Sequence, residues 1–200
     1  MKAIIEHLGQ DPILRPILSE KLSLGRASND LFGDLIRSIT GQQLSTKAAA
    51  TIHGRFVASF AEGVTPAAVL RKNIDQLRAV GLSQQKSNYV QNVAQYFEKN
   101  PLTEAQWSQM TDEELIAQLT DIKGVGKWTV QMILMFSLQR PDVFPVDDLG
   151  IKNAMVELYG LEETGKALKQ KMLEIAIRWS PYRTYASRFL WDWRDGKKSE

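Results

Sequence analysis

Two neighbouring aspartates, Asp147 and Asp148, are the residues of this chain best suited to acid–base chemistry. They follow Pro145-Val146 and precede a helical apolar pattern that starts near Leu149. An aspartate directly before a helix often caps it, because its carboxylate accepts hydrogen bonds from the first free backbone amides. One of the two is expected to cap the helix, and we assign capping to Asp147 and the candidate chemistry to Asp148.

A glycine-rich turn upstream offers a way to hold an anion. Gly124 and Gly126 bracket Val125, and glycine both adopts positive φ and lets a phosphate approach without a Cβ clash. We expect a helix to begin near Lys127, where free amides and the helix dipole favour an anion. The turn therefore predicts a helix–hairpin–helix that binds the DNA backbone. Its predicted contact residues are Lys123, Gly124, Val125, Gly126, Lys127 and Thr129.

A Gly-x-Gly turn can also simply join two helices. The capping-box pattern Thr111-Asp-Glu-Glu114 upstream and the apolar helix downstream favour the hairpin over this plain connection. Carbonyl oxygens near Ile122 and Gly124 could in addition coordinate a monovalent cation that bridges the hairpin to a phosphate.

Composition narrows the function classes. The 200 residues can bury a sizeable core, and their net charge of +2 means that any DNA binding must rest on a local site. The chain has no cysteine and two histidines, which excludes disulfides, Cys-ligated zinc, iron–sulfur clusters and a His-rich metal site. No apolar run has membrane-spanning length and the first residues lack a signal-peptide core. We therefore expect no membrane partner and a cytoplasmic location, nucleoid-associated in a bacterium.

Apolar residues recur at helical spacing along nearly the whole chain and predict an all-α protein with short loops. Ser83 is expected to cap one of the helices. The segment from Lys127 to Leu138 is apolar enough to predict a buried helix. The helical patterns cover residues 31–39, 48–60, 83–97, 112–119, 127–138, 151–158, 167–177 and 182–193.

Five motifs occur together in an order that resembles the helix–hairpin–helix, Gly/Pro-rich-loop, aspartate (HhH-GPD) superfamily of DNA glycosylases. They are Arg37-Ser-Ile-Thr-Gly-Gln-Gln-Leu-Ser45, Val80-Gly-Leu-Ser-Gln-Gln-Lys-Ser87, Ile122-Lys-Gly-Val-Gly-Lys-Trp-Thr-Val130, Asp142-Val-Phe-Pro-Val-Asp-Asp-Leu-Gly-Ile-Lys152, and Trp179-Ser-Pro-Tyr-Arg-Thr-Tyr-Ala186 with Trp191. The resemblance spans about residues 28–195. It is closest to the 3-methyladenine DNA glycosylase II branch, in a short all-helical form without the N-terminal sheet region of larger members.

The resemblance implies a fold of two helical layers or subdomains with the active-site cleft between them. Residues 1–200 would form one glycosylase unit, with a wedge-loop subdomain at about 28–105 and a hairpin subdomain at about 106–195 on which the N-terminal helix packs. Asp148 would be catalytic. The wedge loop would be Gln42, Gln43, Leu44 and Ser45, with Gln43 or Leu44 filling the space of a flipped base. The base pocket would be lined by Trp128, Trp191, Met132 and His53.

The implied activity is hydrolysis of the N-glycosidic bond of alkylated purines, such as 3-methyladenine or 7-methylguanine, after base flipping in double-stranded DNA. The enzyme would act as a monomer and without a cofactor. Bifunctional members carry a lysine nucleophile in the second hairpin helix, and that position is Trp128 here. Three alternatives stay open: a non-catalytic DNA-binding hairpin module, a bifunctional glycosylase/lyase, and an unrelated helical scaffold. The preferred lesion also stays open.

Overall fold

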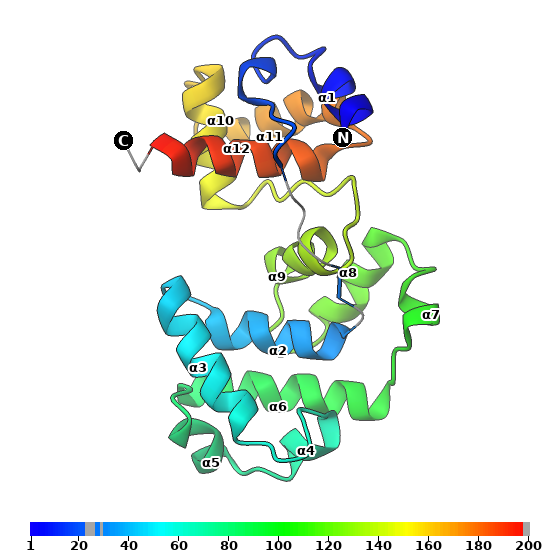
Figure 1. Ribbon diagram of the computed structural model, residues 1–200, viewed down its shortest axis with the longest axis vertical. Coiled ribbons are helices and arrows are strands. Elements are labelled where there is room, and N and C mark those ends of the chain that lie inside the picture. Colours follow the sequence, from blue (N-terminus) through cyan, green and yellow to red (C-terminus); the bar gives the residue numbers. More distant parts are fainter. Residues whose placement is uncertain (23–26, 29, 198–200) are drawn as a thin grey trace. The chain divides into compact units, whose positions relative to one another are not determined.

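The computed structural model describes residues 1–22, 27–28 and 30–197 (Figure 1). None of these described residues lies in a β-strand, so the prediction of an all-α protein is confirmed. Within the same residues, no helix combines the length and apolar character needed to cross a membrane. The chain divides into two compact units, one formed by residues 1–27 and 134–200 (unit 1) and one by residues 28–133 (unit 2).

Unit 2 is built around one long helix, α6 (Gln84–Lys99). Helices α2, α4 and α5 pack against α6, and α3 packs on α2. The buried side chains Val90, Val93 and Ala94 form the inner face of α6, and Leu35 and Ile39 form that of α2. The other helices of unit 2 are α2 (Leu31–Gly41), α3 (Thr46–Ala58), α4 (Pro66–Leu70), α5 (Ile74–Ala79), α7 (Glu104–Trp107), α8 (Asp112–Thr120) and α9 (Lys127–Met132).

Short polar side chains set where several of these helices begin. Ser83 accepts a hydrogen bond from the backbone N–H of Lys86 at 3.2 Å and so caps α6. Thr111 and Glu114 form a reciprocal capping box at the start of α8. Both caps confirm the predictions made from the sequence.

The apolar segment after the hairpin is helical and mostly buried, as predicted, but it is not a single α-helix and part of it is exposed. Helix α9 ends at Met132 and continues as a π-helix, η2 (Ile133–Ser137). Trp128 and Phe136 are 42% and 38% exposed, although Val130 and Leu134 are buried. A π-helix has more residues per turn than an α-helix, so apolar spacing alone does not fix which way each side chain points.

Unit 1 packs around the buried indole of Trp179. Its core includes Leu8, Leu14, Met155 and Phe189, which come from segments far apart in the sequence. Helix α12 packs on α10, and the 3-10 helix η3 packs on α1 and α11. Besides residues 134–137 of η2, its helices are α1 (Lys2–Leu8), η1 (Arg15–Ile17), α10 (Leu149–Tyr159), α11 (Gly165–Ala176), η3 (Ile177–Trp179) and α12 (Arg183–Lys197).

A buried carboxylate ties the N-terminal segment to this core. Asp11 Oδ2 accepts hydrogen bonds from the Tyr159 hydroxyl at 2.8 Å and from Trp179 Nε1 at 3.1 Å. Its Oδ1 accepts the backbone N–H groups of Ile13 and Leu14 at 3.0 and 3.2 Å. Burial raises the pKa of Asp11, but these four hydrogen bonds together outweigh burial and place the pKa below the ordinary value.

Replacing Asp11 with alanine leaves a buried hydroxyl, an indole N–H and two backbone N–H groups without their acceptor. We expect the free energy of unfolding at neutral pH to fall by about 2 to 4 kcal/mol, because each buried unsatisfied group is costly. The contribution of the lowered pKa is fully present above the ordinary value of 3.8 and disappears as the pH falls through the folded-state pKa. Urea denaturation of both proteins as a function of pH measures both effects.

The control is Asp75→Ala, which removes an exposed carboxylate 3.7 Å from Arg78. That change should alter the free energy of unfolding by no more than about 0.5 kcal/mol. Equal losses for the two variants would contradict the anchoring role of Asp11.

Candidate active site

Asp148 caps helix α10. Its Oδ1 accepts the backbone N–H of Ile151 at 2.8 Å, and its backbone is extended, as an N-cap requires. The prediction that Asp147 caps this helix is wrong: the first helical residue is Leu149, so the capping position falls on Asp148. The exposed side chain of Asp147 instead forms an ion pair with Lys169 at 2.6 Å.

A tryptophan from helix α12 binds the same carboxylate oxygen. Trp191 Nε1 donates to Asp148 Oδ1 at 2.9 Å, so two donors from different helices fix the orientation of this carboxylate. Gly150 makes the approach possible, since a Cβ there would lie 2.9 Å from Trp191 Nε1 and 3.0 Å from Asp148 Oδ1. The sequence motif contained Gly150, but without the fold it gave no reason for a glycine at that position.

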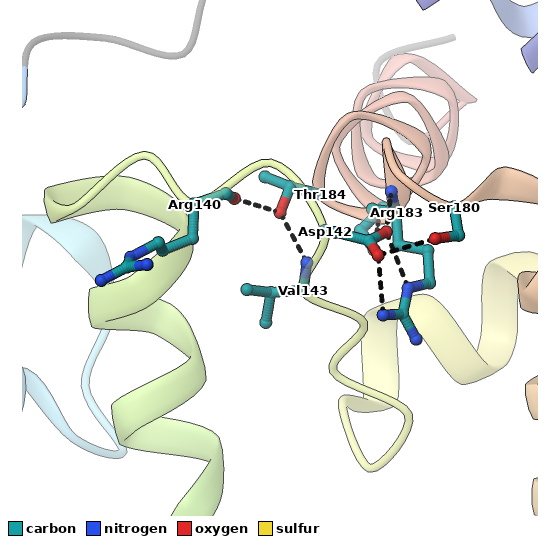
Figure 2. A network of polar contacts seen from close by, with 7 residues as sticks. Arg140, Asp142, Val143, Ser180, Arg183 and Thr184 are labelled. Carbon is teal, nitrogen blue, oxygen red and sulfur yellow. Dashed lines mark hydrogen bonds and ion pairs between the residues drawn. The ribbon is translucent and has the colours of Figure 1, made fainter. Parts of the chain in front are cut away.

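The segment that leads to Asp148 is fastened to the start of α12 (Figure 2). The Thr184 hydroxyl donates to the carbonyl of Arg140 at 2.6 Å and accepts the backbone N–H of Val143 at 3.0 Å. The backbone N–H of Thr184 also donates to the carbonyl of Pro141 at 3.0 Å. Helix α12 therefore holds this segment at its beginning through Thr184 and at its end through Trp191.

Asp142 adds an ion pair to the same junction (Figure 2). Arg183 binds its two oxygens through Nε and an Nη at 2.8 and 2.9 Å, and the Ser180 hydroxyl donates to Oδ2 at 2.8 Å. Burial raises the pKa of Asp142, while the bonds from Arg183 and Ser180 lower it further than burial raises it. Asp142 therefore stays ionised and serves to hold the loop.

Phe136 is an aromatic residue of this site that the sequence analysis missed. Its ring stacks on Trp191, with ring centroids 5.8 Å apart and an interplanar angle of 24°. The guanidinium carbon of Arg188 lies 4.7 Å from the Phe136 ring centroid. Phe136 lies in an apolar stretch of the sequence, where a phenylalanine is expected to be an ordinary core residue, so the sequence did not indicate a role for it in the site. In the structure it is 38% exposed.

The other predicted members of the base pocket belong to unit 2. Trp128 is exposed on α9, and Met132 lies half-buried at the end of the same helix. His53 is half-buried on α3, with Nδ1 3.2 Å from the Thr40 hydroxyl. Burial, and then the positive charge of Arg37, lower the pKa of His53. His53 is therefore mainly neutral at pH 7, and a pocket shared by all four predicted residues stays a prediction.

The predicted hairpin is present between α8 and α9. Gly124 has φ of +106°, and Gly126 is the N-cap of α9. Ile122 and Val125 are buried, and the backbone N–H of Val125 donates to the carbonyl of Ile122 at 2.9 Å. Lys123 and Lys127 are exposed beside the turn, whereas the side chain of Thr129 is buried.

Two side chains of helix α6, Tyr89 and Asn92, contact the hairpin. A Cβ on Gly124 would overlap the Cβ, Cγ and Cδ1 atoms of Tyr89. Asn92 Nδ2 donates to the carbonyl of Lys123 at 3.0 Å. A carbonyl oxygen has two lone pairs, so that of Ile122 keeps acceptor capacity beside its bond to Val125. The predicted monovalent cation near Ile122 and Gly124 stays a prediction.

The predicted wedge loop joins α2 to α3. Gln43 and Leu44 are exposed at its tip, and Gln43 has φ of +58°. Ser45 accepts the backbone N–H of Ala48 at 3.4 Å and caps α3. Lys86 of α6 donates to the carbonyl of Gln42 at 2.7 Å. Lys86 lies in the sequence motif that spans residues 80–87, which indicated no role for it.

The chain is similar to known proteins in sequence and in fold. The profile of the HhH-GPD superfamily of base excision DNA repair proteins matches residues 36–179. The chain is 36% identical over 163 residues to DNA-3-methyladenine glycosylase 1 of Schizosaccharomyces pombe, covering 80% of this chain and 71% of that relative. It is 33% identical over 168 residues to YfjP of Bacillus subtilis, covering 80% of this chain but only 58% of YfjP. The S. pombe 3-methyladenine DNA glycosylase Mag1 in complex with abasic DNA matches with a TM-score of 0.81 at 32% identity, covering 95% of both chains.

The two hairpin glycines should respond differently to substitution. Gly124→Ala should lower the free energy of unfolding by about 2 kcal/mol or more. Alanine is strained at the positive φ of this position, and its methyl group would overlap the Tyr89 side chain. At position 126 a Cβ would meet open space and φ is −96°, so Gly126→Ala should lower the free energy of unfolding by no more than about 1 kcal/mol. Urea denaturation of the two variants measures the difference, and equal losses would contradict the packing of Gly124 on Tyr89.

Proposed function

This chain belongs to the HhH-GPD superfamily of base excision DNA repair proteins, and from that premise we propose that it is a monofunctional DNA glycosylase that hydrolyses the N-glycosidic bond of alkylated purines. Its substrate is double-stranded DNA that carries such a base, and one copy of the chain acts on it. The observation that carries the proposal is the carboxylate of Asp148, which the α10 backbone and the Trp191 indole hold through one oxygen.

The chemistry follows from the charge of the substrate. An N-alkylated purine is cationic, so the base leaves without strong general-acid help. Positive charge then develops on the deoxyribose, and a fixed carboxylate stabilises that charge and orients or deprotonates the attacking water. Asp148 takes this role, and the products are the free base and an abasic site. The lowered pKa of His53 agrees with a reaction that needs no protonated histidine.

The duplex must open before this bond can be reached. Glycosylases extrude the target nucleotide, at a cost of a few kcal/mol in lost stacking and pairing. In our proposal the exposed tip of the wedge loop, Gln43 and Leu44, fills the vacated space. The extruded base is held by aromatic faces, and each such stack contributes about 1 to 3 kcal/mol.

The indole beside Asp148 favours a cationic base over a neutral one. Trp191 presents π-electron density next to the carboxylate, to which it donates through Nε1. A cation over an aromatic ring gains about 0.5 to 2 kcal/mol. We therefore propose 3-methyladenine and 7-methylguanine as better substrates than hypoxanthine.

The hairpin supplies affinity without regard to the lesion. The amides at the start of α9 and the exposed Lys123 and Lys127 suit a phosphate. A monovalent cation held by the carbonyls of Ile122 and Gly124 would add positive charge facing the same phosphate.

The decisive experiment incubates the protein with methylated duplex DNA and separates the released bases by chromatography. Wild-type protein should release 3-methyladenine or 7-methylguanine. Asp148→Asn should lower the single-turnover rate by about 100-fold or more, the scale of a lost positioned acid–base group. The asparagine oxygen still accepts from Ile151 and Trp191, so the fold and DNA affinity should remain.

Asp147→Asn is the matched control. It breaks only the exposed ion pair with Lys169, and such pairs contribute little. Its rate should stay within about threefold of the wild type. DNA binding without release of any base would instead make the chain a non-catalytic hairpin module, and a slow Asp147→Asn with a fast Asp148→Asn would reverse the assignment.

The same reaction should proceed without a covalent intermediate, because Trp128 occupies the position of the lysine nucleophile found in bifunctional members. Borohydride added during turnover should trap no protein–DNA adduct, and the strand should break only after treatment with alkali. A lysine-dependent adduct that forms as fast as the base is released would show a lyase mechanism.

A further inference from the structure

Lys86 is a partly buried lysine whose ammonium group binds the end of a neighbouring helix. Its Nζ donates to the carbonyl oxygens of Thr40 at 3.0 Å and of Gln42 at 2.7 Å. These acceptors lie 46 and 44 residues away in the sequence, on the last turn of α2 and the first residue after it. The contact is therefore a tertiary link between the start of α6 and the wedge loop.

These two hydrogen bonds supply partners for carbonyl groups at the C-terminal end of α2. The last carbonyl groups of a helix have no partner within the helix, and they carry its partial negative charge. The Lys86 ammonium group satisfies the helix carbonyl of Thr40 and also that of Gln42, the residue after the helix. Burial lowers the pKa of Lys86, which is the cost of keeping an ammonium group in this partly buried position.

The residues that follow need such support. Gln43, with φ of +58°, occupies a conformation that side chains other than glycine rarely adopt. Leu44 next to it exposes 38% of its surface. A loop of this kind holds its shape only when the surrounding structure fixes it. We call the two hydrogen bonds from Lys86 to the carbonyls of Thr40 and Gln42 the clamp. Gln42 is the residue directly before Gln43, so the clamp fixes the backbone next to the residue with positive φ.

We propose that Lys86 is a positioning residue that holds the wedge loop rigid, so that Gln43 and Leu44 can enter DNA and stabilise the extruded nucleotide. The proposal rests on the proposed glycosylase function. In this role Lys86 contacts neither the base nor the sugar. It acts on the free energy of base extrusion and leaves the bond-breaking step unchanged.

Helix α6 gives the clamp a fixed relation to the hairpin. Asn92 of the same helix binds the Lys123 carbonyl, and it follows Lys86 by less than two helical turns, or about 9 Å of rise. The wedge loop and the hairpin of unit 2 are thus both attached to one rigid element. Removing the clamp should loosen the loop and leave the hairpin in place.

The test compares single-turnover excision of 7-methylguanine from two duplexes, one with cytosine and one with an abasic site opposite the lesion. Lys86→Met keeps most of the length of the side chain but cannot donate a hydrogen bond. With cytosine opposite the lesion, the excision rate of Lys86→Met should be about 10- to 100-fold lower than that of wild type, the scale expected when a positioning group is displaced by about 1 Å. Opposite the abasic site, where extrusion costs less, the deficit should shrink to about threefold or less.

Two further variants separate positioning from general damage. Lys86→Arg keeps the charge and the donors and should recover most of the rate opposite cytosine. Lys99→Met removes an exposed lysine from the last turn of the same helix and should act like wild type on both duplexes. Equal losses for Lys86→Met on the two duplexes, or no loss on either, would overturn the proposal.

Hydrogen exchange tests the clamp independently of activity. In Lys86→Met the backbone amides of residues 42–48 should exchange faster than in wild type, while those of the hairpin, residues 122–130, should not change. Unchanged exchange in the loop, or faster exchange throughout unit 2, would overturn the clamp. If the wild-type protein releases no base, the proposed function fails, and this measurement still decides whether Lys86 holds the loop.

Discussion

Irregular backbone needs side chains from elsewhere to hold it, because its own carbonyl groups lack regular partners. Among the residues that the structure describes, this constraint is met in the same way at three places. Lys86 binds the carbonyls at the wedge loop, Asn92 binds that of the hairpin, and Thr184 binds that of Arg140 before the aspartate segment. Two helices, α6 and α12, provide all three side chains, so loop geometry depends on helix packing within each unit.

In the proposed function, Asp148 combines a structural and a chemical role in one carboxylate. As the N-cap of α10 it is fixed by the helix that it starts, and Trp191 fixes it from a second direction. A group held in this way loses little orientational freedom when a substrate binds, which is an advantage for electrostatic stabilisation of a developing cation. Gly150 is the condition for this arrangement, since a side chain there would separate the indole from the carboxylate.

The net charge of only +2 agrees with candidate DNA contacts that depend on few charged side chains. The hairpin relies on backbone amides and two lysines, and the wedge loop presents an amide and an apolar side chain. Part of the positive charge of the chain also serves the structure itself. Lys86 binds carbonyl groups, Arg183 holds Asp142, and Lys169 pairs with Asp147. Contacts of the hairpin kind bind the phosphate backbone without reading its sequence.

The sequence by itself determined what depends on neighbours in the chain. Helical spacing gave the all-α class, Ser83 and Thr111 gave two helix starts, and the two glycines gave the hairpin turn, because caps and turns are local structures. Only the tertiary structure decided the long-range relations. It placed residues 106–133, which contain the hairpin, in one unit with the wedge loop, joined Trp191 to Asp148, stacked Phe136 on Trp191 and brought Lys86 to the wedge loop. It also moved the cap from Asp147 to Asp148, because a shift of one residue at a helix start lies below the resolution of an apolar pattern.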